Sequence, residues 1–89
     1  MPKIYHAAGP GVRLAEALGA DGDLRSQLSG DVHLVSLDGR AFYPFSRRPA
    51  EGDYDTIKDL IDDDVTRPMD YSRGIVDRAM GGIEEIEVE

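Results

Sequence analysis

Two short apolar runs near the middle of the chain predict a β-hairpin. The runs flank Asp38-Gly39, a dipeptide typical of a two-residue type I′ turn, in which both central residues need positive φ. The cross-strand pairs that this turn predicts are Leu37 with Arg40, Val35 with Phe42 and His33 with Pro44 on one face, and Ser36 with Ala41, Leu34 with Tyr43 and Val32 with Phe45 on the other. Because both faces carry apolar residues, we expect both to be covered.

Both ends of the chain carry a further strand pattern. Residues 3–7 (KIYHA) form the N-terminal candidate, and residues 84–89 (EEIEVE) form the C-terminal one. The second alternates strictly, so Ile86 and Val88 are predicted to face inward while the glutamates between them face outward. Outward charge discourages pairing with another chain, which favours a place at the edge of the sheet.

Between the first strand and the hairpin, helical spacing predicts two short helices. The first begins after a glycine-rich turn at Pro10, since proline suits the first helical position, and extends to about residue 18. The second carries Leu24 and Leu28 one turn apart, with Asp21 or Asp23 as its N-cap.

A clearer amphipathic helix follows the hairpin, with Asp53 as its N-cap. One arc of about 140° holds Tyr54, Ile57, Leu60, Ile61 and Val65. The opposite side carries Asp55, Asp59, Asp62 and Asp63. Pro68 is expected to end this helix near Thr66, because the residue before a proline disfavours the α conformation.

A last helix is predicted over residues 71–80, between Asp70 as its N-cap and Gly81 as its stop. Gly74 inside it costs about 1 kcal/mol relative to alanine, so either a neighbour packs closely there or the helix is locally weak.

These elements predict a single α+β domain over residues 1–89. The central hairpin (about 32–45) is extended by the N- and C-terminal strands into a sheet, which about four short helices pack against.

The net charge of −8 lies almost wholly in the C-terminal half of the chain. Residues 1–50 carry a net charge of +1, whereas residues 51–89 hold four basic and thirteen acidic side chains, a net charge of −9. Direct nucleic-acid binding needs a basic footprint, so this balance argues against it. Adaptation to high salt is the alternative explanation of the acidity, because arginine greatly outnumbers lysine and aspartate outnumbers glutamate.

The acidic side chains fall into a regular array that we interpret as a partner-binding face. Its members are Asp55, Asp59, Asp62, Asp63, Asp64, Glu85, Glu87 and Glu89. Neighbouring carboxylates lie about 6 Å apart along a helix and about 6.6–6.8 Å apart along a strand, a scale comparable to the spacing of phosphates. A rigid array of this kind could occupy a basic groove meant for DNA or RNA. The plainer interpretation is a solvated face that keeps the protein soluble.

A second contact patch is predicted at the end of the hairpin. It combines Tyr43 and Phe45 with Arg47 and Arg48, a composition found at interface hot spots. Its charge is opposite to that of the acidic face, so a homodimer is a further prediction. The alternative is a pair of core aromatic residues followed by a solvated basic loop.

The chain offers little that indicates catalysis. His6 and His33 become neighbours if their strands pair, and with an aspartate they would form a weak metal or acid–base site; two unrelated histidines are the alternative. Cysteine is absent, and the D-x-D pairs lack the spacing of a calcium loop. We therefore expect no catalytic residue, no metal and no cofactor.

Three functional hypotheses follow. The first is a cytoplasmic acidic module that occupies a basic surface of a larger partner, in its sharpest form an inhibitor of a nucleic-acid-binding complex of the kind that phages or mobile elements direct against host defence. The second is a regulatory subunit or antitoxin-like partner. The third is a small metal-dependent enzyme. No apolar run is long enough to span a membrane, so no membrane association is expected.

Overall fold

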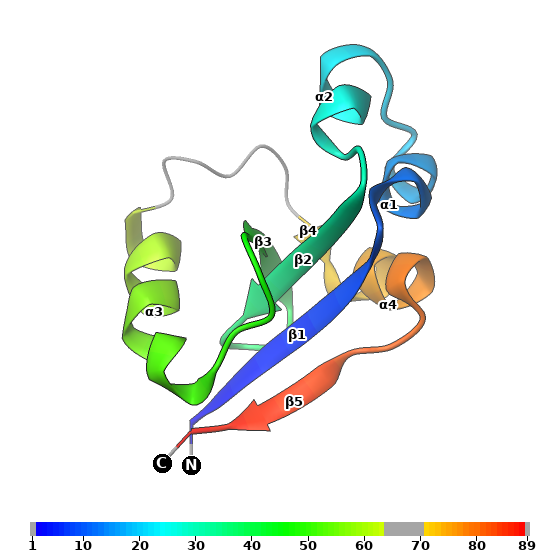
Figure 1. Ribbon diagram of the computed structural model, residues 1–89. Coiled ribbons are helices and arrows are strands. Elements are labelled where there is room, and N and C mark those ends of the chain that lie inside the picture. The colour runs from blue at the N-terminus through cyan, green and yellow to red at the C-terminus, as the bar shows by residue number, and fades with distance from the viewer. Residues whose placement is uncertain (1, 64–70, 89) are drawn as a thin grey trace.

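The fold is built on a five-stranded antiparallel sheet in the order β4-β3-β2-β1-β5. The computed structural model describes residues 2–63 and 71–88 (Figure 1). The strands are β1 (Lys3–Pro10), β2 (Asp31–Ser36), β3 (Ala41–Phe45), β4 (Tyr71–Ser72) and β5 (Glu84–Glu87). The helices are α1 (Gly11–Leu18), α2 (Gly22–Gln27), α3 (Tyr54–Asp63, preceded by the 3-10 turn Glu51–Asp53) and α4 (Arg73–Met80). The protein is thus a small α+β domain, as predicted.

Both faces of the sheet are covered, which confirms the expectation for the hairpin. Figure 1 shows α3 on one side of the sheet and α1 and α4 on the other. The larger cluster packs under α1 and α4 and contains Ala7, Leu14, Leu34, Phe42, Tyr71 and Val76. The smaller cluster packs under α3 and contains Ile4, Val35, Ile57 and Val88. Each cluster uses alternate residues of the same strands, as the two-residue period of a strand requires.

The predicted hairpin register is wrong by one residue. The structure pairs His33 with Phe45, Leu34 with Pro44 and Val35 with Tyr43. A shift of one residue moves every side chain of one strand to the other face relative to its partner. Phe42 therefore shares the α1–α4 face with Leu34 instead of lying beside Val35.

A side-chain network at the turn explains this register. The buried Ser36 hydroxyl donates to Asp38 Oδ1 (2.9 Å) and accepts the N–H of Gly39 (2.9 Å). Asp38 Oδ1 also accepts the N–H groups of Arg40 (2.8 Å) and Ala41 (3.1 Å). Burial alone would raise the pKa of Asp38, but these hydrogen bonds hold it below 3.8. The carboxylate thus organises a longer connection than the type I′ turn.

Ser36→Ala is expected to lower the free energy of unfolding by about 1–3 kcal/mol, because it leaves the buried N–H of Gly39 without its partner. Ser26→Ala is the matched control, since its exposed hydroxyl bonds only Gly22 O within α2. Urea unfolding of both variants measures the difference. Equal stability of the two variants would contradict this role of Ser36.

The last helix begins two residues later than predicted. Tyr71 and Ser72 form β4, which pairs with Phe42 and Ala41 of β3, so α4 begins only at Arg73. Tyr71 is 1% exposed and belongs to the larger cluster, and β-sheet pairing therefore overrides the helical spacing that includes it. Gly81 ends α4 in the left-handed conformation, as expected.

The structure also places β1, β5 and Gly74. β1 extends to Pro10, three residues further than predicted, and α1 follows it at once. The C-terminal strand lies at the edge of the sheet as expected, with Ile86 in the smaller cluster. Gly74 is exposed, and a Cβ added there would meet no atom within 4 Å, so close packing does not explain this glycine. The predicted helix end at residues 66–68 and the cap at residue 70 lie outside the described residues.

Candidate functional site

The pairing of β1 with β2 brings the two histidines together. His6 lies opposite Val35 and Ala8 lies opposite His33, so both imidazoles project from the α3 side of the sheet on adjacent strands. The ring centroids lie 5.2 Å apart and the two ring planes are nearly parallel, with an angle of 14° between them. Nε2 of His6 lies 3.0 Å from Nδ1 of His33, which is hydrogen-bonding distance.

Two further side chains extend this pair across the sheet. β5 places Glu84 opposite His6, and Glu84 Oε1 accepts a hydrogen bond from His6 Nδ1 at 3.0 Å. Arg48, in the loop after β3, donates to the same carboxylate through Nε (3.1 Å) and Nη2 (2.9 Å). These hydrogen bonds, first from Arg48 and then from His6, lower the pKa of Glu84 to about 2. We call this group of four side chains the histidine chain.

The histidine chain was only partly predictable from the sequence. Contact between the histidines follows from the pairing of their strands, which was anticipated. The roles of Glu84 and Arg48 were missed, although a signal for Glu84 existed: it lies two residues before Ile86 and therefore points to the same face. A carboxylate directed toward a covered face needs a hydrogen-bonding partner. Nothing local in the sequence links Arg48 to that strand.

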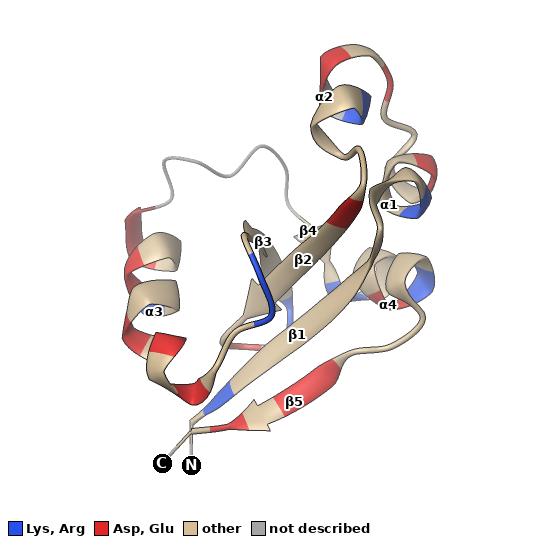
Figure 2. Cartoon of the chain, viewed as in Figure 1, with Lys and Arg blue, Asp and Glu red and all other residues tan. Residues whose placement is uncertain are grey.

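The acidic residues of α3 form a surface of their own. Asp55, Asp59, Asp62 and Asp63 are exposed, and Figure 2 shows acidic residues along the side of α3 that faces away from the sheet. Within residues 2–63 and 71–88, no lysine or arginine lies within ion-pair distance of these four carboxylates. We call these four residues the α3 acidic surface. Asp64, which was predicted to belong with them, lies outside the described residues.

The acidic residues of β5 lie apart from α3. Ile86 packs in the smaller cluster under α3, so Glu85 and Glu87, which alternate with it along β5, project from the opposite face of the sheet. Glu85 pairs with Lys3 at 2.8 Å, and that lysine lies opposite Glu87 in the adjacent strand. Glu89 lies outside the described residues. The structure therefore does not bring the acidic helix and the C-terminal strand together as one array.

The residues of the predicted basic and aromatic patch have contacts within the chain. Tyr43 is buried, and Phe45 packs against the smaller cluster. Arg47 donates to both oxygens of Asp53 (2.6 and 2.8 Å) and its guanidinium lies 5.5 Å from the centroid of Phe45. Arg48 belongs to the histidine chain. Both arginines therefore help to fix the loop that leads into α3, while a role in contacting a partner stays a prediction.

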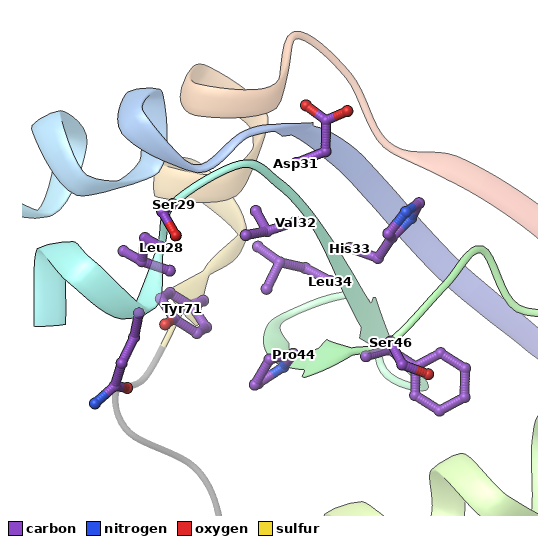
Figure 3. A pocket seen from close by; sticks show the side chains of 11 residues that line it. Leu28, Ser29, Asp31, Val32, His33, Leu34, Pro44, Ser46 and Tyr71 are labelled. Carbon is purple, nitrogen blue, oxygen red and sulfur yellow. The ribbon is translucent and has the colours of Figure 1, made fainter.

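A pocket of about 420 Å³ opens where β2 continues beyond the last residue of β3. Figure 3 shows Leu28, Leu34 and Tyr71 on one side of β2, with Asp31 and His33 directed to the other side. Apolar side chains thus form most of one wall, and His33 also lines the pocket.

Metal binding finds no support in the described part of the chain, where no group of three His, Asp or Glu side chains is placed to hold an ion. His6 in particular has both ring nitrogens engaged in hydrogen bonds. Among the described helices, none combines the length and apolar character that crossing a membrane requires.

The stability of the fold is expected to fall as the pH is lowered from about 5 to about 2. Hydrogen bonds from Arg47 and then from the N–H of Ala50 lower the pKa of Asp53 to about 2, from an ordinary value of 3.8. Glu84 is lowered to about 2 from 4.5. A carboxyl group whose pKa is lower in the folded state stabilises the fold above its ordinary pKa, and this contribution disappears as the group is protonated.

Urea unfolding midpoints at neutral and acid pH measure this dependence. The double variant Asp53→Asn, Glu84→Gln should show a weaker loss of stability in acid than the parent protein. A midpoint that stays constant in the parent between about pH 6 and pH 3 would contradict the assignment.

No family model, characterised protein or solved structure matches this chain.

Proposed function

We propose that the protein is a small binding module whose α3 acidic surface contacts a basic surface on a larger partner protein. The observation that carries this proposal is a difference among the carboxylates of the C-terminal half. Asp53, Glu84 and Glu85 form ion pairs within the chain. The four carboxylates of the α3 acidic surface have no such partner among the described residues.

The amphipathic character of α3 supports the proposal. Ile57 is fully buried on the side facing the sheet, so the helix is anchored and its opposite side is held outward. Carboxylates also accumulate at the C-terminal end of α3, where each exposed one costs about 0.3–1 kcal/mol through the helix dipole. A binding role gives a reason for charges that do not stabilise the helix.

Long-range electrostatics would speed the encounter with a basic partner. Charge complementarity raises association rates, and this effect weakens as salt screens the charges. In the sharpest form of the proposal, the partner is a nucleic-acid-binding complex and the α3 acidic surface occupies part of its basic groove. Action in the cytoplasm stays a prediction, as does the expectation that this binding role involves no catalysis.

Affinity capture from the natural host, followed by competition, tests this proposal. The immobilised protein should retain a basic protein after nuclease treatment, and added DNA or RNA should compete with that interaction. Retention that depends on nucleic acid, or a captured protein without a basic surface, would contradict the proposal.

A further inference from the structure

The histidine chain runs from a surface arginine through a buried ring to a more open one. His6 is 6% exposed, whereas His33 is half-buried. His6 uses both ring nitrogens, one toward Glu84 and one toward His33. His33 uses Nδ1 toward His6, and no described residue hydrogen-bonds to its Nε2. Asp31, two residues away on β2, projects on the same side as His33 (Figure 3).

Glu84 determines which nitrogens donate in the hydrogen bonds of the histidine chain, because its carboxylate can only accept. With a pKa of about 2, this carboxyl group is ionised at neutral pH and has no proton to donate. His6 must therefore carry its proton on Nδ1, which leaves a lone pair on Nε2 when the ring is neutral. His33 must then donate from Nδ1, so the lone pair of neutral His33 lies on Nε2.

The same chain can hold one extra proton without losing a hydrogen bond. If a proton binds His33 Nε2, the Nδ1 proton of His33 can pass across the 3.0 Å contact to Nε2 of His6. His6 then donates from both nitrogens, and its positive charge lies beside Glu84, which Arg48 holds in place. Positioning of a histidine by a carboxylate is the arrangement that makes imidazole an effective base.

We propose that Arg48, Glu84 and His6 orient His33 as a surface base, whose Nε2 accepts a proton from a hydroxyl group of water or an alcohol bound beside it. In this step the O–H bond breaks, the proton goes to Nε2, and the oxygen keeps the electron pair. No oxidant or reductant takes part. His33 is the base, while His6 and Glu84 are positioning residues. The site uses none of the α3 carboxylates and is independent of the proposed binding function.

Nitrogen NMR tests which ring nitrogens of His6 and His33 carry protons. The protein has two histidines, so their ¹⁵N signals can be assigned with single variants. At about pH 8 both rings should show a protonated Nδ1 and an unprotonated Nε2. In Glu84→Gln this preference should be lost, because an amide can donate as well as accept. Glu85→Gln, which removes the neighbouring paired carboxylate, should leave it intact. A proton on Nε2 of His33 in the parent protein at this pH would overturn the proposal.

Hydrolysis of ethyl dichloroacetate tests the base with water as the hydroxyl group, because its poor leaving group disfavours direct attack by imidazole on the ester. Water attacks the ester carbonyl and gives its proton to His33, the proton then passes to the leaving ethoxide, and the products are dichloroacetic acid and ethanol. His33→Gln should reduce the rate to the level of buffer, and Glu84→Gln should reduce it roughly tenfold or more. Glu85→Gln should keep the parent rate. If Glu84→Gln does not fold, His6→Gln makes the same comparison, because its amide cannot pass on a proton. A parent rate that survives His33→Gln, or equal rates for the Glu84 and Glu85 variants, would overturn the proposal.

Discussion

Replacement of Gly11 by alanine is expected to lower the free energy of unfolding by at least about 3 kcal/mol. A Cβ at this position would lie 1.7 Å from the carbonyl oxygen of Leu28 and 2.6 Å from its carbonyl carbon. Both are backbone atoms, so no side-chain rotation can relieve the clash. The Gly11 N–H also donates to Gly30 O at 2.7 Å, which holds the start of α1 against this segment.

Gly74→Ala is the matched control for this prediction. It introduces the same methyl group at an exposed position in α4, where a Cβ meets nothing within 4 Å. This variant should be more stable than the parent by up to about 1 kcal/mol, since alanine is the better helix former. Thermal and urea unfolding measure both variants. Similar stability of Gly11→Ala and the parent would show that the junction of β1 and α1 is not packed as described.

The second large effect is expected for Ile57→Ala, with a loss of about 2–5 kcal/mol. Ile57 is fully buried and is the one residue of α3 that is buried within the smaller cluster. Removing its side chain leaves a cavity between the helix and Ile4 and Val35 of the sheet. Because α3 carries the acidic surface, its weaker attachment should also reduce partner binding, although no charge has changed.

Val12→Ala provides the comparison for Ile57→Ala. Val12 is an aliphatic residue on α1 that is 48% exposed, so its truncation should change the stability by less than about 0.5 kcal/mol. Hydrogen exchange of the α3 amides distinguishes local detachment from global unfolding. Unchanged exchange in α3 of the Ile57 variant would contradict the view that this side chain anchors the helix.

The sequence predicted the elements of the fold better than their register. Alternation and helical spacing depend on neighbouring residues, so β5 and α1 were located correctly. The helical part of α3 within the described residues was also located correctly, but Asp53 lies in the preceding 3-10 turn and accepts the N–H of Ala50 instead of capping α3. The hairpin register was missed because the side chains of Ser36 and Asp38 bond the turn backbone and compete with the two-residue turn that Asp-Gly favours. Tyr71 was assigned to a helix because its spacing fits one, whereas pairing with Phe42 fixes it in a strand.

The candidate sites were also predictable only where neighbouring residues determine them. The exposure of the α3 carboxylates could be predicted, because a single amphipathic helix determines which side faces outward. The histidine chain could not be predicted in full, since Glu84 and Arg48 are 36 residues apart in sequence and meet only through the sheet and the loop after β3. The positions of the protons along the histidine chain depend on the ion pair between Glu84 and Arg48.

A binding comparison between charge-matched variants tests the central claim most directly. One variant neutralises the α3 acidic surface with Asp55→Asn, Asp59→Asn, Asp62→Asn and Asp63→Asn. The control removes four exposed carboxylates elsewhere with Glu16→Gln, Asp21→Asn, Asp23→Asn and Asp77→Asn. Both change the net charge equally and leave the described ion pairs intact.

The dissociation constant for the captured partner is measured at low and at physiological salt. We expect the α3 variant to bind roughly tenfold or more weakly than the parent and to lose most of the salt dependence, while the control stays close to the parent. Equal weakening of the two variants would assign the effect to net charge alone. Unchanged binding of the α3 variant would show that the α3 acidic surface is not the contact.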